Sequence, residues 1–239
     1  NCSKMIKHLL ISFLALSITA TAQAGIIVSG NIDDSQSLPV SLKMNENESN
    51  DDIFLYTEQE NFLLADDLNV DYLGSTTDAG VIASGTVVNS FVLNFDAVGG
   101  DYTVNSFNAT GSYLFDTEIL GIIWGGTRPD GQQIGVNGNS ATAPSSGFLD
   151  ISDDIFKVSG TTYATGEIGR GLEPEAWFNS NNTADVVSVS NAGYQLDLSL
   201  WVKPAYADQL RVITAVPEPS TLVLFGAAVL CLLNLRRTS

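Results

Sequence analysis

The sequence predicts an all-β protein, an antiparallel sandwich or jelly roll flanked by an N-terminal signal helix and a C-terminal transmembrane helix. Two segments, at 91–96 and 194–202, alternate apolar and polar residues with the period of two that is typical of strands. Gly, Asn, Asp and Ser interrupt such segments at short intervals, as at Gly99 and Gly100. Outside the two ends, no long stretch shows a convincing helical stripe of apolar residues. Many short strands separated by turns favour two packed antiparallel layers.

The alternation predicts one buried and one solvated face for each of these two segments. In the first, we expect Phe91, Leu93 and Phe95 to face the core, and Asn94 and Asp96 to face water. Less regular segments of the same kind predict further strands at 64–72, 103–115, 119–124, 185–190 and 210–214. Two polar stretches, at 45–52 and 125–147, are predicted to be loops.

Residues 1–24 have the features of a secretory signal peptide. We expect translation to begin at Met5, which places Lys7 in a positively charged region ahead of a short apolar run. Ala22 and Ala24 then form a small-x-small cleavage site. We therefore expect the general secretion machinery to export the chain and signal peptidase to cut it after Ala24.

The segment at 25–214 has the length of a single domain with a sizeable core. The chain's only histidine, His8, and its two cysteines, Cys2 and Cys231, lie outside this segment. The exported domain therefore has no disulfide framework, no nitrogen or sulfur ligand for a metal, and no neutral-pH base or thiol nucleophile of these types. We expect a domain that is not an enzyme and needs no cofactor, with calcium left open as a ligand of its carboxylates.

The exported segment is strongly acidic. All but one of the 27 Asp and Glu residues and six of the 10 Lys and Arg residues lie in it, which gives it a formal net charge of −20. Nucleic acid is not expected as a partner, because phosphate backbones are bound by clustered basic residues and these six are scattered. Like-signed charge keeps exported domains soluble. Binding of calcium or of a polycationic matrix is the alternative.

The best calcium candidate combines Asp67, Asn69, Asp71 and Asp78, which follow the first, third, fifth and twelfth positions of a calcium loop. The sixth position, which needs glycine, is Tyr72. A solvated strand face is therefore the alternative. Three pairs of adjacent acids are equivalent calcium candidates, at 33–34, 51–52 and 153–154.

An enzymatic alternative is a carbohydrate-active hydrolase that uses paired carboxylates. Glu167, Glu173 and Glu175 lie close in sequence to Trp177, so acids and a stacking aromatic meet there. A solvated loop whose Trp177 packs under the sheet would give the same pattern.

The C-terminal 25 residues, 215–239, differ from the rest of the chain. The proposed sorting motif and its basic terminus are Val216, Pro217, Glu218, Pro219, Ser220, Arg236 and Arg237. Between them lies an apolar run at 222–235, which would span about 21 Å as a helix, against roughly 30 Å of hydrocarbon. This length favours a transient transmembrane helix over a permanent anchor. The terminal arginine pair predicts that the C-terminus faces the cytoplasm and that the domain lies outside.

At these residues the sequence resembles the PEP-CTERM sorting signal of Gram-negative bacteria. The resemblance implies that an exosortase, a membrane-embedded cysteine peptidase, cuts near Pro217, Glu218 and Pro219 and passes the protein to the cell surface or the extracellular matrix. It also implies an association with exopolysaccharide. The same tail is sometimes named after ice-binding proteins, but the exported domain has no Thr-x-Thr array at a fixed period, so we do not expect ice binding.

The exported domain also resembles a group of uncharacterised PEP-CTERM proteins, at 90–96, 115–121, 170–173 and 208–214. That resemblance implies an exported all-β domain and identifies no catalytic residue. The leading hypothesis is therefore a non-enzymatic surface or matrix β domain, held transiently in the inner membrane and then processed, with exopolysaccharide as its expected partner. The alternatives are the hydrolase and a calcium-dependent adhesion module.

Overall fold

The structure, a computed structural model, describes residues 25–74, 78–100, 106–125, 148–165, 170–172, 185–204 and 206–217. The predicted signal peptide, with Ala22 and Ala24, and the apolar run at 222–235 lie outside these residues. Within the described part of the chain, no helix has the length and apolar character needed to cross a membrane. The described chain is mostly β, which confirms the all-β prediction.

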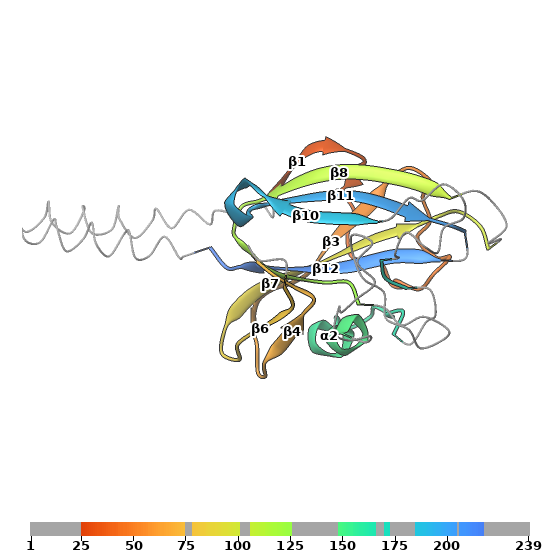
Figure 1. Ribbon diagram of the computed structural model, residues 1–239. Helices are drawn as coiled ribbons and strands as arrows, with labels where there is room; N and C mark the ends of the chain where they lie inside the picture. The colour runs from red at the N-terminus through yellow and green to blue at the C-terminus, as the bar shows by residue number, and fades with distance from the viewer. Residues whose placement is uncertain are drawn as a thin grey trace, which may run out of the picture.

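A four-stranded antiparallel sheet forms one layer (Figure 1). Its strands, in spatial order, are β1 (Gly25–Gly30), β8 (Phe107–Phe115), β11 (Gln195–Val202) and β10 (Val186–Ser190). A short 3-10 helix, η3 (Asn191–Gly193), joins β10 to β11. Along β11 every second residue is buried, so the alternation predicted at 194–202 is confirmed from Gln195 onward.

A six-stranded sheet forms the second layer, and all its neighbouring strands are antiparallel except β2 and β3. In spatial order its strands are β2 (Ile32–Asp33), β3 (Ile53–Leu63), β7 (Val87–Asp96), β12 (Ala207–Ala215), β9 (Ile119–Ile123) and β5 (Tyr72–Leu73). The two central strands, β7 and β12, pair along their whole length.

The main core lies between the two sheets. Phe91, Leu93 and Phe95 of β7 point into it as predicted, together with Leu210 and Val212 of β12 and apolar residues of β8 and β11. The Phe91 and Phe115 rings connect the layers, with centroids 5.1 Å apart. Because successive residues of a strand point to opposite sides, the other half of β7 and β12 faces away from this core.

That outer face of the six-stranded sheet is also covered, which corrects the prediction of a solvated face. Val92, Asn94 and Asp96 are all buried. The acidic segment at 45–52 is a loop as predicted, but it lies over this face: the Asn45 amide donates to Asp96 at 2.6 Å, and the Asn94 amide donates to a carbonyl of the same loop. Polar side chains on this face therefore need partners inside the protein.

The other cover on this face is a helix that the sequence pattern did not predict, α2 (Phe148–Phe156) (Figure 1). Its buried positions are Leu149, Ser152, Asp153 and Phe156, which have helical spacing but are half polar, so they form no apolar stripe. Leu149 and Phe156 pack in a second apolar cluster with side chains of β7, β9 and β12. A small two-stranded sheet of β4 (Leu68–Val70) and β6 (Gly80–Ile82) completes that cluster.

The strand predicted at 64–72 is wrong in its extent. β4 and β5 share this region but belong to different sheets, and the buried residue Asp71 separates them. The segments predicted at 119–124, 185–190 and 210–214 correspond to β9, β10 and the second half of β12. In the segment predicted at 103–115, the described part is β8.

Candidate functional site

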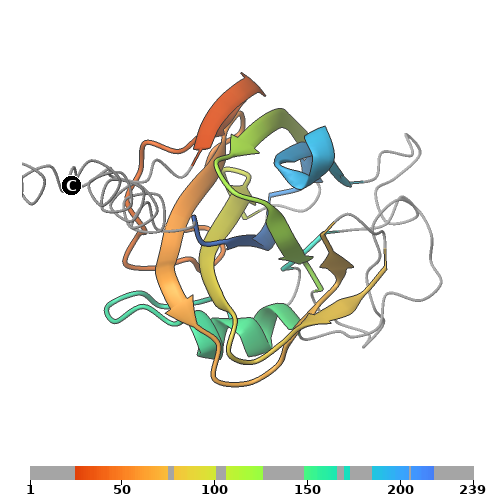
Figure 2. The same ribbon diagram turned by 90° about the vertical axis from the view of Figure 1, so that its left-hand side faces the viewer.

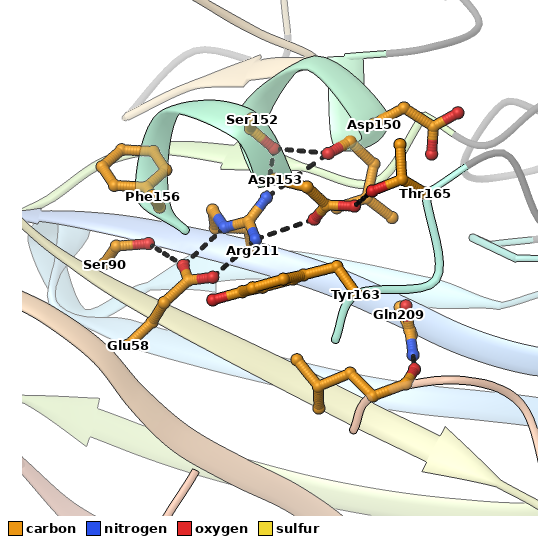
Figure 3. A network of polar contacts seen from close by, with 12 residues as sticks. Glu58, Ser90, Asp150, Ser152, Asp153, Phe156, Tyr163, Thr165, Gln209 and Arg211 are labelled. Carbon is orange, nitrogen blue, oxygen red and sulfur yellow. Dashed lines mark hydrogen bonds and ion pairs between the residues drawn. The ribbon is translucent and has the colours of Figure 1, made fainter. Parts of the chain in front are cut away.

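A cluster of charged side chains is buried between α2 and the outer face of the six-stranded sheet (Figure 3). Arg211 projects from β12 toward α2, because its neighbours Leu210 and Val212 face the main core. Its guanidinium binds the Glu58 carboxylate of β3 in a bidentate manner, at 2.7 and 2.8 Å. Both side chains are fully buried.

Arg211 also holds the helix. It donates to Asp153 at 3.0 Å and to the hydroxyl of Ser152, both in α2, and its guanidinium lies 5.5 Å from the centre of the Phe156 ring. Figure 3 shows Arg211 between the Glu58 carboxylate on one side and the helix on the other. One arginine therefore ties together β3, β12 and α2.

Asp153 is shared between two arginines. In addition to Arg211, it accepts hydrogen bonds from Arg170 at 2.5 and 2.9 Å and from the Thr165 hydroxyl at 2.7 Å. Arg170 also donates to Asp150 at 2.9 Å and to Gln209 at 2.7 Å. The four fully buried ionic groups, two arginines and two carboxylates, balance in charge.

The cluster continues through Gln209 into the loops that cover the sheet. The Gln209 amide donates to the Leu42 carbonyl and to Asn94, each at 2.7 Å. On the β7 side, the Ser90 hydroxyl donates to Glu58 at 2.6 Å. Burial, the charge of Glu58 and a hydrogen bond with Glu58 raise the pKa of Tyr163, so this phenol stays neutral beside the cluster.

The cluster keeps its charges despite its burial. Desolvation alone would raise the pKa of Asp153, but the hydrogen bonds and charge of Arg170, followed by the charge of Arg211, lower it below its usual value. Likewise, the charges of Glu58 and Asp153 outweigh desolvation and raise the pKa of Arg211. Only Asp150 is appreciably exposed, at 31% of its side chain. The polar groups are thus occupied by one another, an arrangement suited to fixing α2 on the sheet rather than to binding a substrate.

The sequence did not predict this cluster. By sequence alone, Arg170 and Arg211 belong to the six scattered basic residues, and Asp153 belongs to one of the acid pairs predicted as calcium candidates. The sequence contains one indication of the cluster, because Arg211 is a charged residue within the largely apolar strand predicted at 210–214. Its partners could not be identified from it, because Glu58 and Arg211 lie 153 positions apart in the sequence.

The predicted calcium ligands do not converge. Asp67 accepts a hydrogen bond from the Ser84 amide at 2.8 Å, whereas Asp71 is buried and accepts the amides of Trp124 and Gly125 at 2.9 and 2.8 Å. Asn69 and Asp78 are exposed. Burial raises the pKa of Asp71 to about 6, against the opposing effect of the Trp124 and Gly125 amides.

The paired acids are also engaged separately. Asp33 accepts from the backbone and hydroxyl of Ser35, and Asp34 from the hydroxyl of Tyr113, while Asp153 belongs to the arginine cluster. Asp52 accepts from the Ser49 hydroxyl. Among the residues that the structure describes, no group of three or more acidic, His or Cys side chains is arranged to hold a metal ion.

The hydrolase candidates Glu167, Glu173, Glu175 and Trp177 lie outside the described residues. The same holds for most of the sorting motif, namely Glu218, Pro219, Ser220, Arg236 and Arg237. Val216 and Pro217 are described, and they follow the last residue of β12, Ala215, directly.

The four-stranded sheet presents a second face of functional interest, opposite the core. Side chains from alternate positions of its strands form it, and hydrogen bonds fix several of them. Asp197 accepts from Ser112 at 2.6 Å, from Ser190 at 2.5 Å and from Gln195 at 2.7 Å. The outward positions of β8, β10 and β11 are Asn108, Thr110, Ser112, Leu114, Val186, Ser188, Ser190, Gln195, Asp197, Ser199 and Trp201. Only one of them is charged.

Comparison with known proteins bears on the C-terminal end. Residues 215–237 match the model of the PEP-CTERM protein-sorting motif. No curated protein and no solved structure matches the chain. The chain therefore carries a PEP-CTERM sorting motif, as its Pro-Glu-Pro residues indicated, and this motif is characteristic of exported proteins that an exosortase processes.

Replacing Asp153 with Asn should destabilise the fold strongly, because it leaves two buried arginines with a single buried carboxylate. We expect the free energy of unfolding to fall by about 3–5 kcal/mol, measured by denaturant titration of the full chain in mild detergent. Asp154→Asn, a change at the exposed next position, is the matched control and should cost less than about 0.5 kcal/mol. Equal effects of the two variants would show that the cluster does not hold α2.

Asp71 should make the protein less stable as the pH rises from 4 to 7. Its pKa is about 6 in the folded protein and about 3.9 in an unfolded chain. The folded state therefore binds more protons in this window and loses stability with increasing pH. Relative to wild type, Asp71→Asn should gain roughly 2–3 kcal/mol between pH 4 and pH 7 in the same unfolding assay. A stability difference that is constant with pH would contradict the raised pKa.

Proposed function

We propose that this chain is an exported surface or matrix protein whose folded β domain is delivered by its C-terminal tail and released from the membrane by an exosortase. The observation that carries the proposal is the PEP-CTERM motif at residues 215–237, which begins at the last residue of β12. The apolar run at 222–235 holds the protein transiently in the inner membrane, and Arg236 and Arg237 keep its C-terminus in the cytoplasm. Signal peptidase removes residues 1–24.

The domain itself is a non-enzymatic module in this proposal. The buried ionic groups under α2 bind one another, and the chain has no histidine or cysteine at 25–214. These features favour a binding or structural role over catalysis. The hydrolase alternative needs an accessible pair of carboxylates, and its candidates lie outside the described residues, so the glycan assay below distinguishes the two functions.

Exopolysaccharide is the ligand that the outward face of the four-stranded sheet fits best. Ser112 and Ser190 donate their hydroxyl hydrogens to Asp197 and so offer acceptors. Other hydroxyl groups, such as those of Thr110 and Ser188, can donate or accept hydrogen bonds, as sugar hydroxyls require. Trp201, which is partly exposed at its outward position on β11, offers an aromatic surface for a sugar ring. Ser112, Ser190 and Gln195 are already oriented by Asp197, which limits the entropy lost on binding.

Processing of the tail is tested with Glu218→Ala in the native host. We expect export to proceed but cleavage to fail, so that the full-length protein accumulates in the membrane. Mass spectrometry of the surface, released and membrane fractions gives the C-terminus in each. Glu118→Ala removes an exposed acid next to Ala215 and is the matched control, which should be processed normally. A surface protein that still carries residues 222–239 would contradict the processing proposal.

Polysaccharide binding is tested on a glycan array that includes the host's own exopolysaccharide. Trp201→Ala should lower binding at least fivefold, whereas Tyr194→Ala, which removes an exposed aromatic outside the outward face, should not. Repeating the array in EDTA identifies a calcium-dependent module if binding disappears. Release of reducing sugar would instead support the hydrolase. Binding that is independent of Trp201 would contradict the role of this face.

A further inference from the structure

Both boundaries of the folded domain lie at one end of the sandwich. β12 ends at Ala215, whose amide donates to the Glu118 carbonyl at 2.8 Å and whose carbonyl accepts from the Thr117 hydroxyl at 2.6 Å. β1 begins at Gly25, which pairs with Phe115. Both therefore adjoin the turn that leads from β8 to β9. We call this end, where β12 runs out at the left of Figure 1 and toward the viewer in Figure 2, the tail-side end.

The length of chain beyond Ala215 fixes how far this end can be from the membrane. Six residues, 216–221, separate Ala215 from the apolar run. Fully extended, they span roughly 20 Å. A headgroup layer takes up about 5–8 Å of that distance. This inference requires the apolar run to lie in the membrane, as proposed above. In that case only a thin layer of water can separate the tail-side end from the headgroups.

Exposed apolar side chains gather at the tail-side end. Leu63 and Val87 pair directly across β3 and β7 and are 60% and 42% exposed. The next residue of β7, Val88, pairs with Ala215, so this apolar pair lies beside the point where the tail leaves. Ile26 of β1 and Tyr194, which follows η3, are exposed at the same end. Single exposed apolar residues are ordinary, but here they lie where the chain's own length brings a lipid surface close.

The acidic residues of the tail-side end determine which headgroup charge a docked membrane can have. Asp66, Asp67, Asp116 and Glu118 are all exposed near this end. An exposed cation, Lys157, follows the Phe156 that packs on Phe62 of β3, but the acids outnumber it. Carboxylates are repelled by anionic headgroups, whereas zwitterionic headgroups carry no net charge and do not repel them. Charge and apolar exposure together point to a neutral phospholipid surface.

We propose that the tail-side end docks on the headgroups of a zwitterionic membrane, with Leu63 and Val87 inserted among them. In this arrangement Pro217, two residues past the end of β12, lies at the level of the headgroups. The sorting motif is thereby presented at the membrane surface while the domain stays folded. Docking on the lipid, rather than the tail alone, sets the height and tilt of the domain during processing.

The test places a fluorophore at each end of β7 in the full chain. Cys2 and Cys231 are changed to Ser, and single cysteines are introduced as Val87→Cys or as the control Val98→Cys. The control position is similarly exposed, at 49%, and lies roughly 35 Å away beyond the other end of β7. In phosphatidylethanolamine–phosphatidylcholine vesicles that carry a headgroup quencher, quenching at Val87→Cys should exceed that at Val98→Cys at least threefold. Leu63→Cys should behave as Val87→Cys does.

Two further experiments distinguish a lipid contact of the domain from mere closeness imposed by the short linker to the apolar run. Replacing half of the lipid with phosphatidylglycerol should reduce quenching at Val87→Cys at least twofold, and an increase would contradict the selection by charge. Inserting ten Gly and Ser residues after Val216 should leave most of the quenching in zwitterionic vesicles. If the insertion abolishes it, proximity came only from the short tether, and the docking proposal is wrong.

Vesicle flotation separates this inference from the function on which it rests. A chain that does not float with the vesicles refutes the membrane placement of the tail, and docking with it. A chain that floats but is quenched equally at both ends of β7 refutes docking alone. If, in that case, Leu63→Asp with Val87→Asp blocks processing in the host, the tail-side end contacts the peptidase instead of lipid, which also overturns the proposal.

Discussion

The pairing of Asp153 with Arg170 and Arg211 is the interaction on which the architecture of this domain depends. A carboxylate and two guanidinium groups are buried together under α2, and such groups are tolerated away from water only when each has a partner. Because the partners come from α2, β12 and Arg170, satisfying these charges requires the three segments to meet as they do in the structure. The Arg211–Glu58 pair extends the constraint to β3. The cluster thus specifies where the helix lies, and apolar packing of Leu149 and Phe156 stabilises it there.

This constraint makes the two layers of the sandwich unequal. The six-stranded sheet is buried on both sides, by the main core and by α2 with the loops, so its central strands carry hardly any exposed residue. The four-stranded sheet is buried on one side only and keeps an outward face of hydroxyl and amide groups. One layer is therefore buried on both sides, and the other has a solvent-exposed face, which is the face proposed above to bind a ligand.

A second asymmetry runs along the strands. Gly25 and Ala215 adjoin the same turn, so a chain attached to a membrane through its C-terminus must present this end of the sandwich to it. In the proposed attachment, the outward polar face, which runs parallel to the strands, stands at an angle to the bilayer and does not press against it. A domain held in this way could engage extracellular polymer along its side while its tail is still in the membrane.

The sequence by itself determined the all-β class, the inward residues of β7 and β11, and the sorting motif, because these depend on local periodicity and on short contiguous patterns. Only the tertiary structure decided that Asn94 and Asp96 are buried, that α2 exists, and that Arg170, Arg211, Glu58 and Asp153 form one cluster. The physical reason is that the two-residue alternation of a strand shows which side chains share a face. It does not show whether another layer of the protein covers that face. Ionic partners more than a hundred positions apart become neighbours only when the sheets assemble, since no local pattern encodes their approach.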